Sequence, residues 1–294
     1  MMAAKPIADQ RVNRGYNPRT WSRNQRQRAL SRLILIPMAI LYVIPYYWMI
    51  ITSFKSNEEL GRTPPSLWPS TFQVSNFHDA VTTIPFGQFL TNTLIITALT
   101  IVGAVISNSL IAYGFSRVEW PGRDTIFYVV IATVFIPFPV LIVSLFDIFA
   151  NLGWVNTFLP LIVPVFLGNA FWIFLMRQFL MQIPMEISDA ARIDGANELQ
   201  IAYQVILPLA KPAIAVIAIF AAISAWNDFL GPLLYLQDES KYTLSIGLTF
   251  FRSQHDVQFN LLMAASTIVV LPVVVIFLAF QRSFIDGLTV GSIK

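Results

Sequence analysis

Four acidic side chains gather within one short polar stretch of this 294-residue chain: Glu186, Asp189, Asp194 and Glu198. Pro184 suits the start of a helix there, because the first turn leaves the N–H that proline lacks unbonded. Carboxylates near that turn are favoured by the positive end of the helix dipole. Gly195 should end the helix, since glycine readily adopts a left-handed backbone. A second short helix should then run to Leu207, and Pro208 should stop it.

The first short helix presents one face of small groups. Ile187, Ala190, Ala191 and Asp194 lie three, four and seven residues apart, and Glu186 and Asp189 stand beside them. Such a surface could dock into the groove of a partner protein. An amphipathic segment resting on the membrane surface, or packed on its own helix bundle, would show the same pattern. The residues by themselves favour neither interpretation.

A second group of polar residues lies inside an apolar stretch. Asp228 follows Trp226 and Asn227, and burying an ionised carboxylate in a membrane costs about 2.5–3.5 kcal/mol, so it marks a functional site by default. A sugar site would use these groups, with polar atoms bonding hydroxyls and an aromatic face stacking on the ring. The competing interpretation, slightly favoured, is a helix break or an interhelical hydrogen-bond cluster near Pro232.

Other polar residues in apolar stretches are weaker candidates for the substrate pathway. Asn108 and Asn169 are more typical of interhelical hydrogen bonding than of ligand binding. Asp147 lies near the end of its stretch and should reach water. His78 and His255 are expected on the surface, because neither has the neighbours of a metal ligand, and the chain has no Cys. We therefore expect no metal site.

The chain contains no phosphate-binding loop of the Gly-x-x-x-x-Gly-Lys-Ser/Thr type. It should therefore hold no ATP itself, and no other cofactor is expected. The energy for any work that it performs must come from a partner or from an ion gradient.

The elements that position these residues are expected to be membrane-spanning helices. Hydrophobic residues make up 56% of the chain and charged ones 12%, against about 25% charged in soluble domains. Stretches of about 20 apolar residues can cross the hydrocarbon, and six occur: 33–54, 89–115, 125–148, 157–176, 213–236 and 261–280. The predicted class is an all-α membrane protein with six transmembrane helices, in one domain over 33–294 after a basic tail over 1–32.

The basic residues predict the orientation. All 19 Lys and Arg lie outside the six stretches, and fifteen of them fall on the side that holds both termini and the 177–212 loop. Positive residues mark the cytoplasmic side, so both termini should be cytoplasmic. The tail should enforce this topology or contact anionic lipid, and nucleic-acid binding is not expected. The first stretch is too long for a signal peptide and should be retained.

The 177–212 loop resembles the EAA loop of binding-protein-dependent ABC importer permeases. The resemblance rests on Glu186-Ile-Ser-Asp-Ala-Ala-Arg-Ile-Asp-Gly-Ala196, with Leu207-Pro208 and Pro212 after it. Residues 190–196 are similar to the form found in the carbohydrate-uptake family, the relatives of maltose permeases. Four further groups of residues match this family in order and spacing: Asn92-Thr93-Leu94; Ala112-Tyr113 with Arg117 and Pro121-Gly122-Arg123; Trp226 to Leu230 with Pro232-Leu233; and Gln281-Arg282 with Gly287 to Gly291.

The resemblance implies that the loop is a coupling helix, lying between spans four and five and inserted in a cleft of a separate ATPase subunit. The residues implied in that contact are Glu186, Ile187, Asp189, Ala190, Ala191, Asp194 and Gly195, with Pro208 closing the second helix. The sequence departs from the family pattern at Asp189, where glutamate is usual, and has its aromatic at Tyr203 rather than at Ala202.

The resemblance further implies a transport subunit, not an enzyme, in the cytoplasmic (inner) membrane of a prokaryote. Its partners would be a second, related permease, an ABC ATPase dimer, an extracytoplasmic solute-binding protein and membrane lipid. The implied substrate is a mono- or oligosaccharide, and glycerol-3-phosphate or another polyol derivative would need the same architecture. The absence of Lys and Arg from the spans favours a neutral sugar. Alternatives are an ion-coupled carrier using Asp228, although no internal repeat supports it, and a membrane scaffold or sensor.

Overall fold

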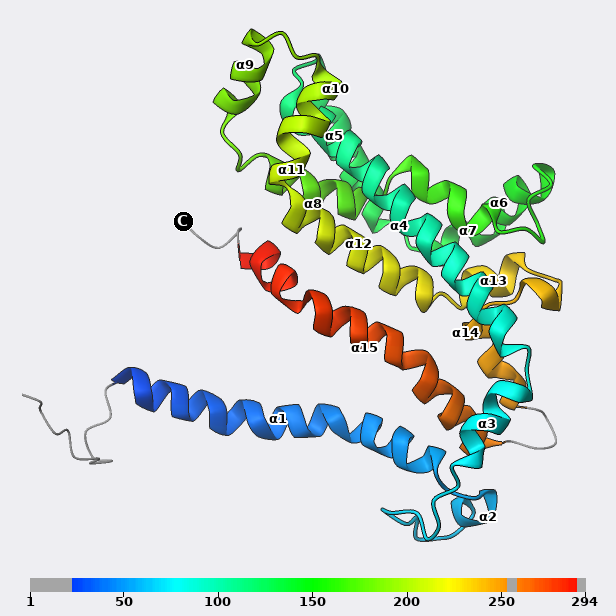
Figure 1. Ribbon diagram of the computed structural model, residues 1–294. Coiled ribbons are helices and arrows are strands. Elements are labelled where there is room, and N and C mark those ends of the chain that lie inside the picture. The colour runs from blue at the N-terminus through cyan, green and yellow to red at the C-terminus, as the bar shows by residue number, and fades with distance from the viewer. Residues whose placement is uncertain (1–22, 253–257, 290–294) are drawn as a thin grey trace, which may run out of the picture. The chain divides into compact units, whose positions relative to one another are not determined.

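The computed structural model describes residues 23–252 and 258–289, and the regular elements among them are helices, without a β-strand (Figure 1). His255 and residues 1–22 lie outside the described residues, and so do the predictions made for them. The chain divides into two compact units, Met1–Trp48 and Met49–Lys294, with α1 (Arg23–Ser53) running across the boundary. The candidate sites lie entirely in the second unit.

The second unit contains long helices joined by short ones. The described helices after α1 are α2 (Asn57–Leu60), α3 (Ser75–Thr82), α4 (Phe86–Arg117), α5 (Arg123–Ala132), α6 (Phe138–Asn151), α7 (Leu159–Ile162), α8 (Ala170–Leu180), α9 (Met185–Ile193), α10 (Glu198–Gln200), α11 (Leu207–Leu209), α12 (Lys211–Trp226), α13 (Leu230–Tyr235), α14 (Leu244–Gly247) and α15 (Phe259–Thr289). A π-helix, η4 (Ile201–Ile206), connects α10 to α11, and a 3-10 segment, η3 (Val163–Leu167), follows α7.

Four described segments are long and apolar enough to cross a membrane, and six are if each of two bent helix pairs counts as one span. The four are Leu30–Ser53, Phe86–Arg117, Leu159–Leu180 and Phe259–Ala279. They match the first, second, fourth and sixth predicted spans to within a few residues. The prediction of an all-helical membrane protein is therefore confirmed, and its six spans correspond to the higher count.

The first bent pair replaces the straight span 125–148 that apolar length predicts, and the second joins α12 to a segment that was predicted as a short helix of the 177–212 loop. α5 and its 3-10 extension meet α6 at 100°, and the segment Glu198–Leu209 meets α12 at 84°. At the first bend Ile136 and Pro137 adopt extended backbone, as expected for a proline and the residue before it. The predicted fifth span 213–236 is also interrupted: α12 ends at Trp226 and a separate helix begins at Leu230.

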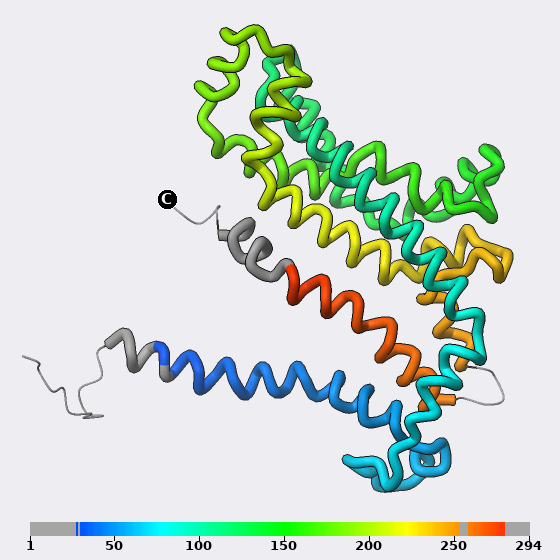
Figure 2. Tube along the Cα trace, viewed as in Figure 1, coloured from blue at the N-terminus to red at the C-terminus, as the bar shows by residue number. Residues whose placement is uncertain are grey.

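α4 packs along α12 and α8, and α12 packs in turn against α15 (Figure 2). The core between α4, α8 and α12 contains several buried alanines, including Ala104, Ala112, Ala213 and Ala221. Small residues let membrane helices approach closely, so that van der Waals packing can hold them together where lipid removes the hydrophobic driving force. These three helices form the frame on which both candidate sites are built.

The segment after α1 forms short helices and turns. Glu59 of α2 is buried, and its carboxylate accepts hydrogen bonds from the Ser66 hydroxyl at 2.7 Å and the Ser70 N–H at 3.0 Å. The Ser66 bond, followed by those from Ser70 and the charge of Lys55, outweighs burial and lowers the pKa of Glu59. The ionised carboxylate of Glu59 therefore stabilises the 59–70 turn by accepting hydrogen bonds from Ser66 and Ser70.

Candidate functional site

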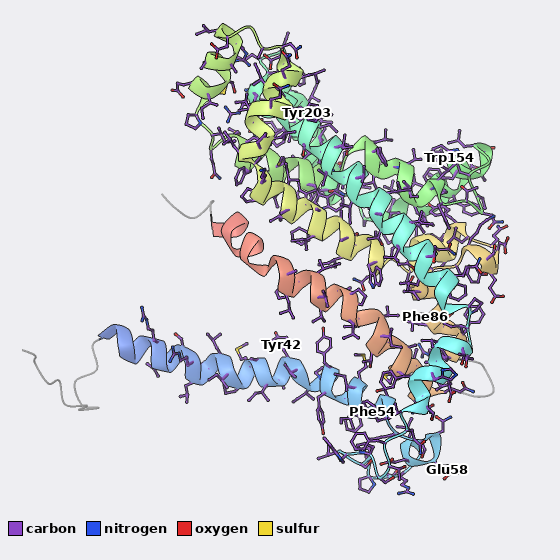
Figure 3. All side chains as sticks on the ribbon, in the orientation of Figure 1. Tyr42, Phe54, Glu58, Phe86, Trp154 and Tyr203 are labelled. Carbon is purple, nitrogen blue, oxygen red and sulfur yellow. The ribbon has the colours of Figure 1, made fainter. Side chains whose placement is uncertain are left out.

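The first short helix of the 177–212 loop forms where the sequence predicts it. α9 runs over Met185–Ile193 with Pro184 as its N-cap, and Gly195 follows it with φ of +84°. α9 and α10 lie together at one end of the α4–α12 pair, with Tyr203 beside them, whereas Phe86 lies at the opposite end of α4 (Figure 3). Both termini of α9 are thus set by residues whose backbone preferences suit them.

Arg192, near the C-terminal end of α9, links this helix to α10 and to α4. Its guanidinium donates to Asp189 at 2.7 Å, to Glu198 at 2.8 Å and to the carbonyl oxygen of Arg117 at 3.3 Å. The hydroxyl of Tyr113 donates to the second carboxylate oxygen of Glu198 at 2.6 Å. Two of the four clustered acids therefore bond to this arginine.

Arg117, the last residue of α4, is fully buried at 1% exposure. Its guanidinium donates to the carbonyl oxygens of Leu180, Ile183 and Pro184, at the end of α8 and just before α9. The last carbonyls of a helix lack partners within it, so this arginine closes α8 from a neighbouring helix. As a result, the end of α4 is bonded to the end of α8 and to the residues just before α9.

The outward side of α9 differs from the small-residue face that spacing predicts. Ile187 and Ala191 are half-buried and pack against the core between α4, α8 and α12, so this part of the face covers the protein itself. Glu186, Ala190 and Asp194 are exposed, and Ile193 is 87% exposed. The surface left for a partner is thus an apolar side chain among small and acidic ones.

The prediction that Pro208 stops the second short helix is wrong. The helix continues through α11 to Leu209, with Pro208 in its first turn and exposed, and the chain turns at Ala210. The π-helix η4 precedes α11, so Pro208 lies at the beginning of a new α-turn that starts at Leu207, where its missing N–H costs little.

A second feature of this unit is a cavity of about 370 Å³ between α4, α7, η3, α8 and α12. Its lining is Ile96, Thr100, Leu161, Pro164, Val165, Gly168, Asn169, Trp172, Ser224, Ala225 and Asp228. Two of the five predicted pathway residues, Asn169 and Asp228, thus meet in one cavity although they come from different helices. No Lys or Arg lines it.

The carboxamide of Asn169 and the carboxylate of Asp228 both also shape the local backbone. The Asn169 oxygen accepts from the N–H of Phe171 at 3.0 Å, which begins α8. The Asp228 carboxylate accepts from the Gly231 N–H at 3.0 Å, which bends the chain into α13. Asp228 thus caps the break in the predicted fifth span, as the competing interpretation expected, and it also lines the cavity.

The other three predicted pathway residues do not line this cavity. Asn108 is fully buried; its NH₂ donates to the Ala104 carbonyl at 2.6 Å and its oxygen accepts from the Asn169 N–H at 2.8 Å. The Trp226 indole donates to Val269 of α15 at 3.1 Å, and the Asn227 NH₂ donates within α12. Asn108 and Trp226 thus bond to other segments of the bundle, and Asn227 bonds within its own helix.

Sequence reasoning missed the residues that complete each site. Arg117 and Tyr113 enter the sequence analysis only as part of a family pattern. An arginine at the end of an apolar helix nevertheless indicates a guanidinium that must find hydrogen-bond acceptors nearby. Thr100 and Ser224 line the cavity but carry no signal in the sequence, because small polar residues are common in membrane helices. No cluster of potential metal ligands is found among the described residues.

Long apolar helices around a mostly apolar cavity with a few polar side chains are typical of a polytopic membrane protein of the transport class. Residues 106–289 match the family described as the binding-protein-dependent transport system inner membrane component. The chain belongs to this family, and it is therefore a multi-pass protein of the inner membrane.

Characterised relatives extend over most of the chain. The permease protein AraQ of the arabinooligosaccharides transport system of Halalkalibacterium halodurans is 34% identical, over 87% of this chain and 93% of its own length. The permease protein MalG of the trehalose/maltose transport system of Thermococcus litoralis is also 34% identical, over 92% and 99%. The diacetylchitobiose uptake system permease protein NgcG of Streptomyces coelicolor is 32% identical, over 93% and 91%.

The fold is that of an ABC transporter permease. A chain in the crystal structure of a bacterial ABC transporter involved in the import of the acidic polysaccharide alginate has a TM-score of 0.75 and 25% identity, covering 89% of this chain and 98% of that chain.

Proposed function

We propose that this chain is the permease subunit of an ATP-driven importer that moves a mono- or oligosaccharide inward. Its family is defined by binding-protein-dependent transport, and the relatives described above are permeases of oligosaccharide or disaccharide systems. In this proposal the chain has no catalytic residue and binds no cofactor, because ATP is bound by a partner. The partners are a second related permease, a cytoplasmic ATPase dimer and an extracytoplasmic solute-binding protein.

The observation that carries the proposal is the bonding of α9 to the end of α4. Arg192 joins α9 to α4 directly, and Arg117 joins α4 to the residues before α9. In the proposed assembly both termini and α9 are cytoplasmic, and α9 inserts into a cleft of the ATPase. The contact would be made by the exposed side chains of 186–195, including Glu186 and Ile193, because these side chains do not pack against the helix bundle.

Movement of α9 would then reach the cavity through α4. Arg117 and Thr100 are 17 positions apart on one continuous helix, which is about 25 Å at 1.5 Å per residue. Closure of the ATPase on ATP would displace α9 and, with it, α4 and α8. The cavity between them would change its access from one side of the membrane to the other, and ATP hydrolysis would reset it.

The chain offers a direct test of the α9 contact, because it has no Cys of its own. We would introduce Ile193→Cys, co-express the complete importer with the ATPase subunit, and measure cross-linking from position 193 to the ATPase. The matched control is Leu271→Cys, which is 55% exposed on α15. Cross-linking from 193 and not from 271 is expected, and equal or absent cross-linking from 193 would contradict the proposed contact.

A second test concerns coupling. In the reconstituted importer, ATPase activity should rise when loaded binding protein is added. Deletion of 186–196 should abolish this stimulation, because the ATPase would lose its link to the cavity. Unchanged stimulation after the deletion would refute the coupling role of α9.

A further inference from the structure

The carboxylate of Glu198 lies between two helices that are far apart along the chain, α4 and α9. One of its oxygens accepts a hydrogen bond from the Tyr113 hydroxyl of α4 at 2.6 Å, and the other accepts from Nε of Arg192 of α9 at 2.8 Å. Glu198 is itself the first residue of α10, whose start is fixed by reciprocal hydrogen bonds between Asn197 and Gln200. One carboxylate therefore bonds α4, α9 and α10 together.

Tyr113 brings its hydroxyl to this junction from inside the bundle. Its ring belongs to the core between α4, α8 and α12 and is only 5% exposed, and a hydroxyl in such a place requires a hydrogen-bond partner. Tyr113 lies one turn before Arg117, so the two side chains leave the same face of α4. Arg117 bonds to Pro184, just before α9, and Tyr113 bonds to Glu198, after it. The end of α4 is thus bonded to the chain before and after α9.

Two routes connect α9 to the long helices of the bundle. Along the chain, α9 continues through α10, η4 and α11 to α12, but the segment Glu198–Leu209 meets α12 at 84°. Part of this segment is the π-helix η4, a rare conformation that is frequent at functional sites. A displacement of α9 is therefore not passed straight along the chain into α12. Through side chains, Tyr113 and Arg117 connect the surroundings of α9 to α4 without an intervening bend.

We propose that Tyr113 is a positioning residue for coupling, whose hydroxyl, through Glu198 and Arg192, makes α4 move with α9. The inference rests on the proposed transport function and adds to it which long helix follows α9 and which group binds it. Arg192 completes the link, because it also donates to the carbonyl oxygen of Arg117 at the end of α4. Without the Tyr113 hydroxyl, α9 still reaches the ATPase, but its movement is passed to α4 less efficiently.

The test uses the complete importer in proteoliposomes and measures how much sugar is taken up per ATP hydrolysed. The probe is whichever of labelled maltose, trehalose, diacetylchitobiose and an arabinooligosaccharide the wild type imports. Tyr113→Phe keeps the ring in the core and removes only the hydroxyl. It should lower the sugar taken up per ATP about 10-fold, which corresponds to the lower value of a hydrogen bond to a charged group. This ratio does not depend on how much importer assembles, so a merely structural role of Tyr113 would leave it unchanged.

Variants of Glu198 test whether the two residues act together. Glu198→Ala should lower the sugar taken up per ATP at least as much as Tyr113→Phe. The double variant should be no worse than Glu198→Ala alone, because both changes remove the same bond. Tyr128→Phe is the matched control: it loses the same hydroxyl from a ring that is 71% exposed on α5, where that hydroxyl has no hydrogen bond among the described residues. Its ratio should equal that of the wild type.

The wild-type ratio in Tyr113→Phe would overturn the inference, and so would additive losses in the double variant. If Tyr113→Phe fails to assemble, Glu198→Gln decides the result, because the Glu198 side chain is 45% exposed and its replacement leaves the core intact. The amide offers one oxygen to two donors, so its ratio should lie between those of the wild type and Glu198→Ala, and a wild-type ratio would contradict the link.

Failure of the proposed function gives a different result. A wild-type importer that takes up sugar independently of ATP would contradict the proposed function itself. A wild type that imports with ATP while Tyr113→Phe matches it would contradict the role of Tyr113 alone.

Discussion

Replacement of Arg117 by methionine should free the segment that precedes α9. Arg117→Met keeps a long side chain of similar volume in a buried position but removes the donors to Leu180, Ile183 and Pro184. Pro184 is exposed, so water can replace the bond to its carbonyl. The other two are lost at about 1.5 kcal/mol each, the lower value for a bond to a charged group.

The expected cost is therefore about 3 kcal/mol for local opening, which is a factor of about 100 in the opening equilibrium. Hydrogen–deuterium exchange of the purified importer, followed by mass spectrometry, measures this opening directly. Peptides covering 181–194 should exchange about 100-fold faster in Arg117→Met than in the wild type. Peptides covering α12 should be unchanged, because the lost bonds do not involve it.

A second arginine at the same end of the bundle provides the control. Arg123 pairs with Asp124 at 3.2 Å on the surface, where such a bridge contributes at most about 1 kcal/mol. Arg123→Gln should therefore change exchange over 181–194 by less than about fivefold. Arg117→Lys keeps the charge but has a single nitrogen donor, so its exchange rate over 181–194 should lie between those of the wild type and Arg117→Met. Wild-type exchange over 181–194 in Arg117→Met would refute the view that this arginine holds α8 and α9 to α4.

Two further substitutions test the local geometry by thermal unfolding of the purified protein. Gly168 has φ of +92°, and an added Cβ would lie 2.7 Å from the side chain of Ile111, so Gly168→Ala should cost about 1–3 kcal/mol and lower the Tm. Gly195 has φ of +84° and an added Cβ would meet open space, so Gly195→Ala should cost only the backbone strain of about 1–2 kcal/mol. A smaller loss of stability at 168 than at 195 would contradict this reasoning. Glu59→Gln should lower the Tm at pH 7, because the folded pKa of Glu59 lies below its ordinary value of 4.5 and its contribution is therefore full above that value. The difference from the wild type should shrink as the pH falls through the folded pKa, and a difference independent of pH would show that the charge of Glu59 contributes nothing.

The sequence predicted the helices well, and the reasons are physical. Apolar length alone determines whether a segment can cross a membrane, so four spans agree with the structure to within a few residues. The bends could not be predicted in the same way, because prolines occur inside straight spans too: Pro272 lies inside α15 without ending it, whereas Pro137 accompanies a turn of 100°. Whether a proline ends a helix depends on which neighbours satisfy the freed carbonyls.

The candidate sites were predicted in part. Pro184 and Gly195 act through their own backbone preferences, so the bounds of α9 could be predicted from local sequence. Asp228 could be identified because a charge in an apolar stretch is rare. The association of Thr100 with Asp228, 128 positions later, depends on how α4 packs against α12, and no local pattern encodes it.

The most direct test of the account is the energy source of uptake. The complete importer would be reconstituted in proteoliposomes with loaded binding protein outside and ATP inside, and the initial rate of labelled sugar uptake would be measured with and without ionophores that abolish ion gradients. The account predicts uptake that requires both ATP and binding protein and is unaffected by ionophores. Uptake that persists without ATP and collapses with the ion gradient would contradict it, and would instead support an ion-coupled carrier that uses Asp228.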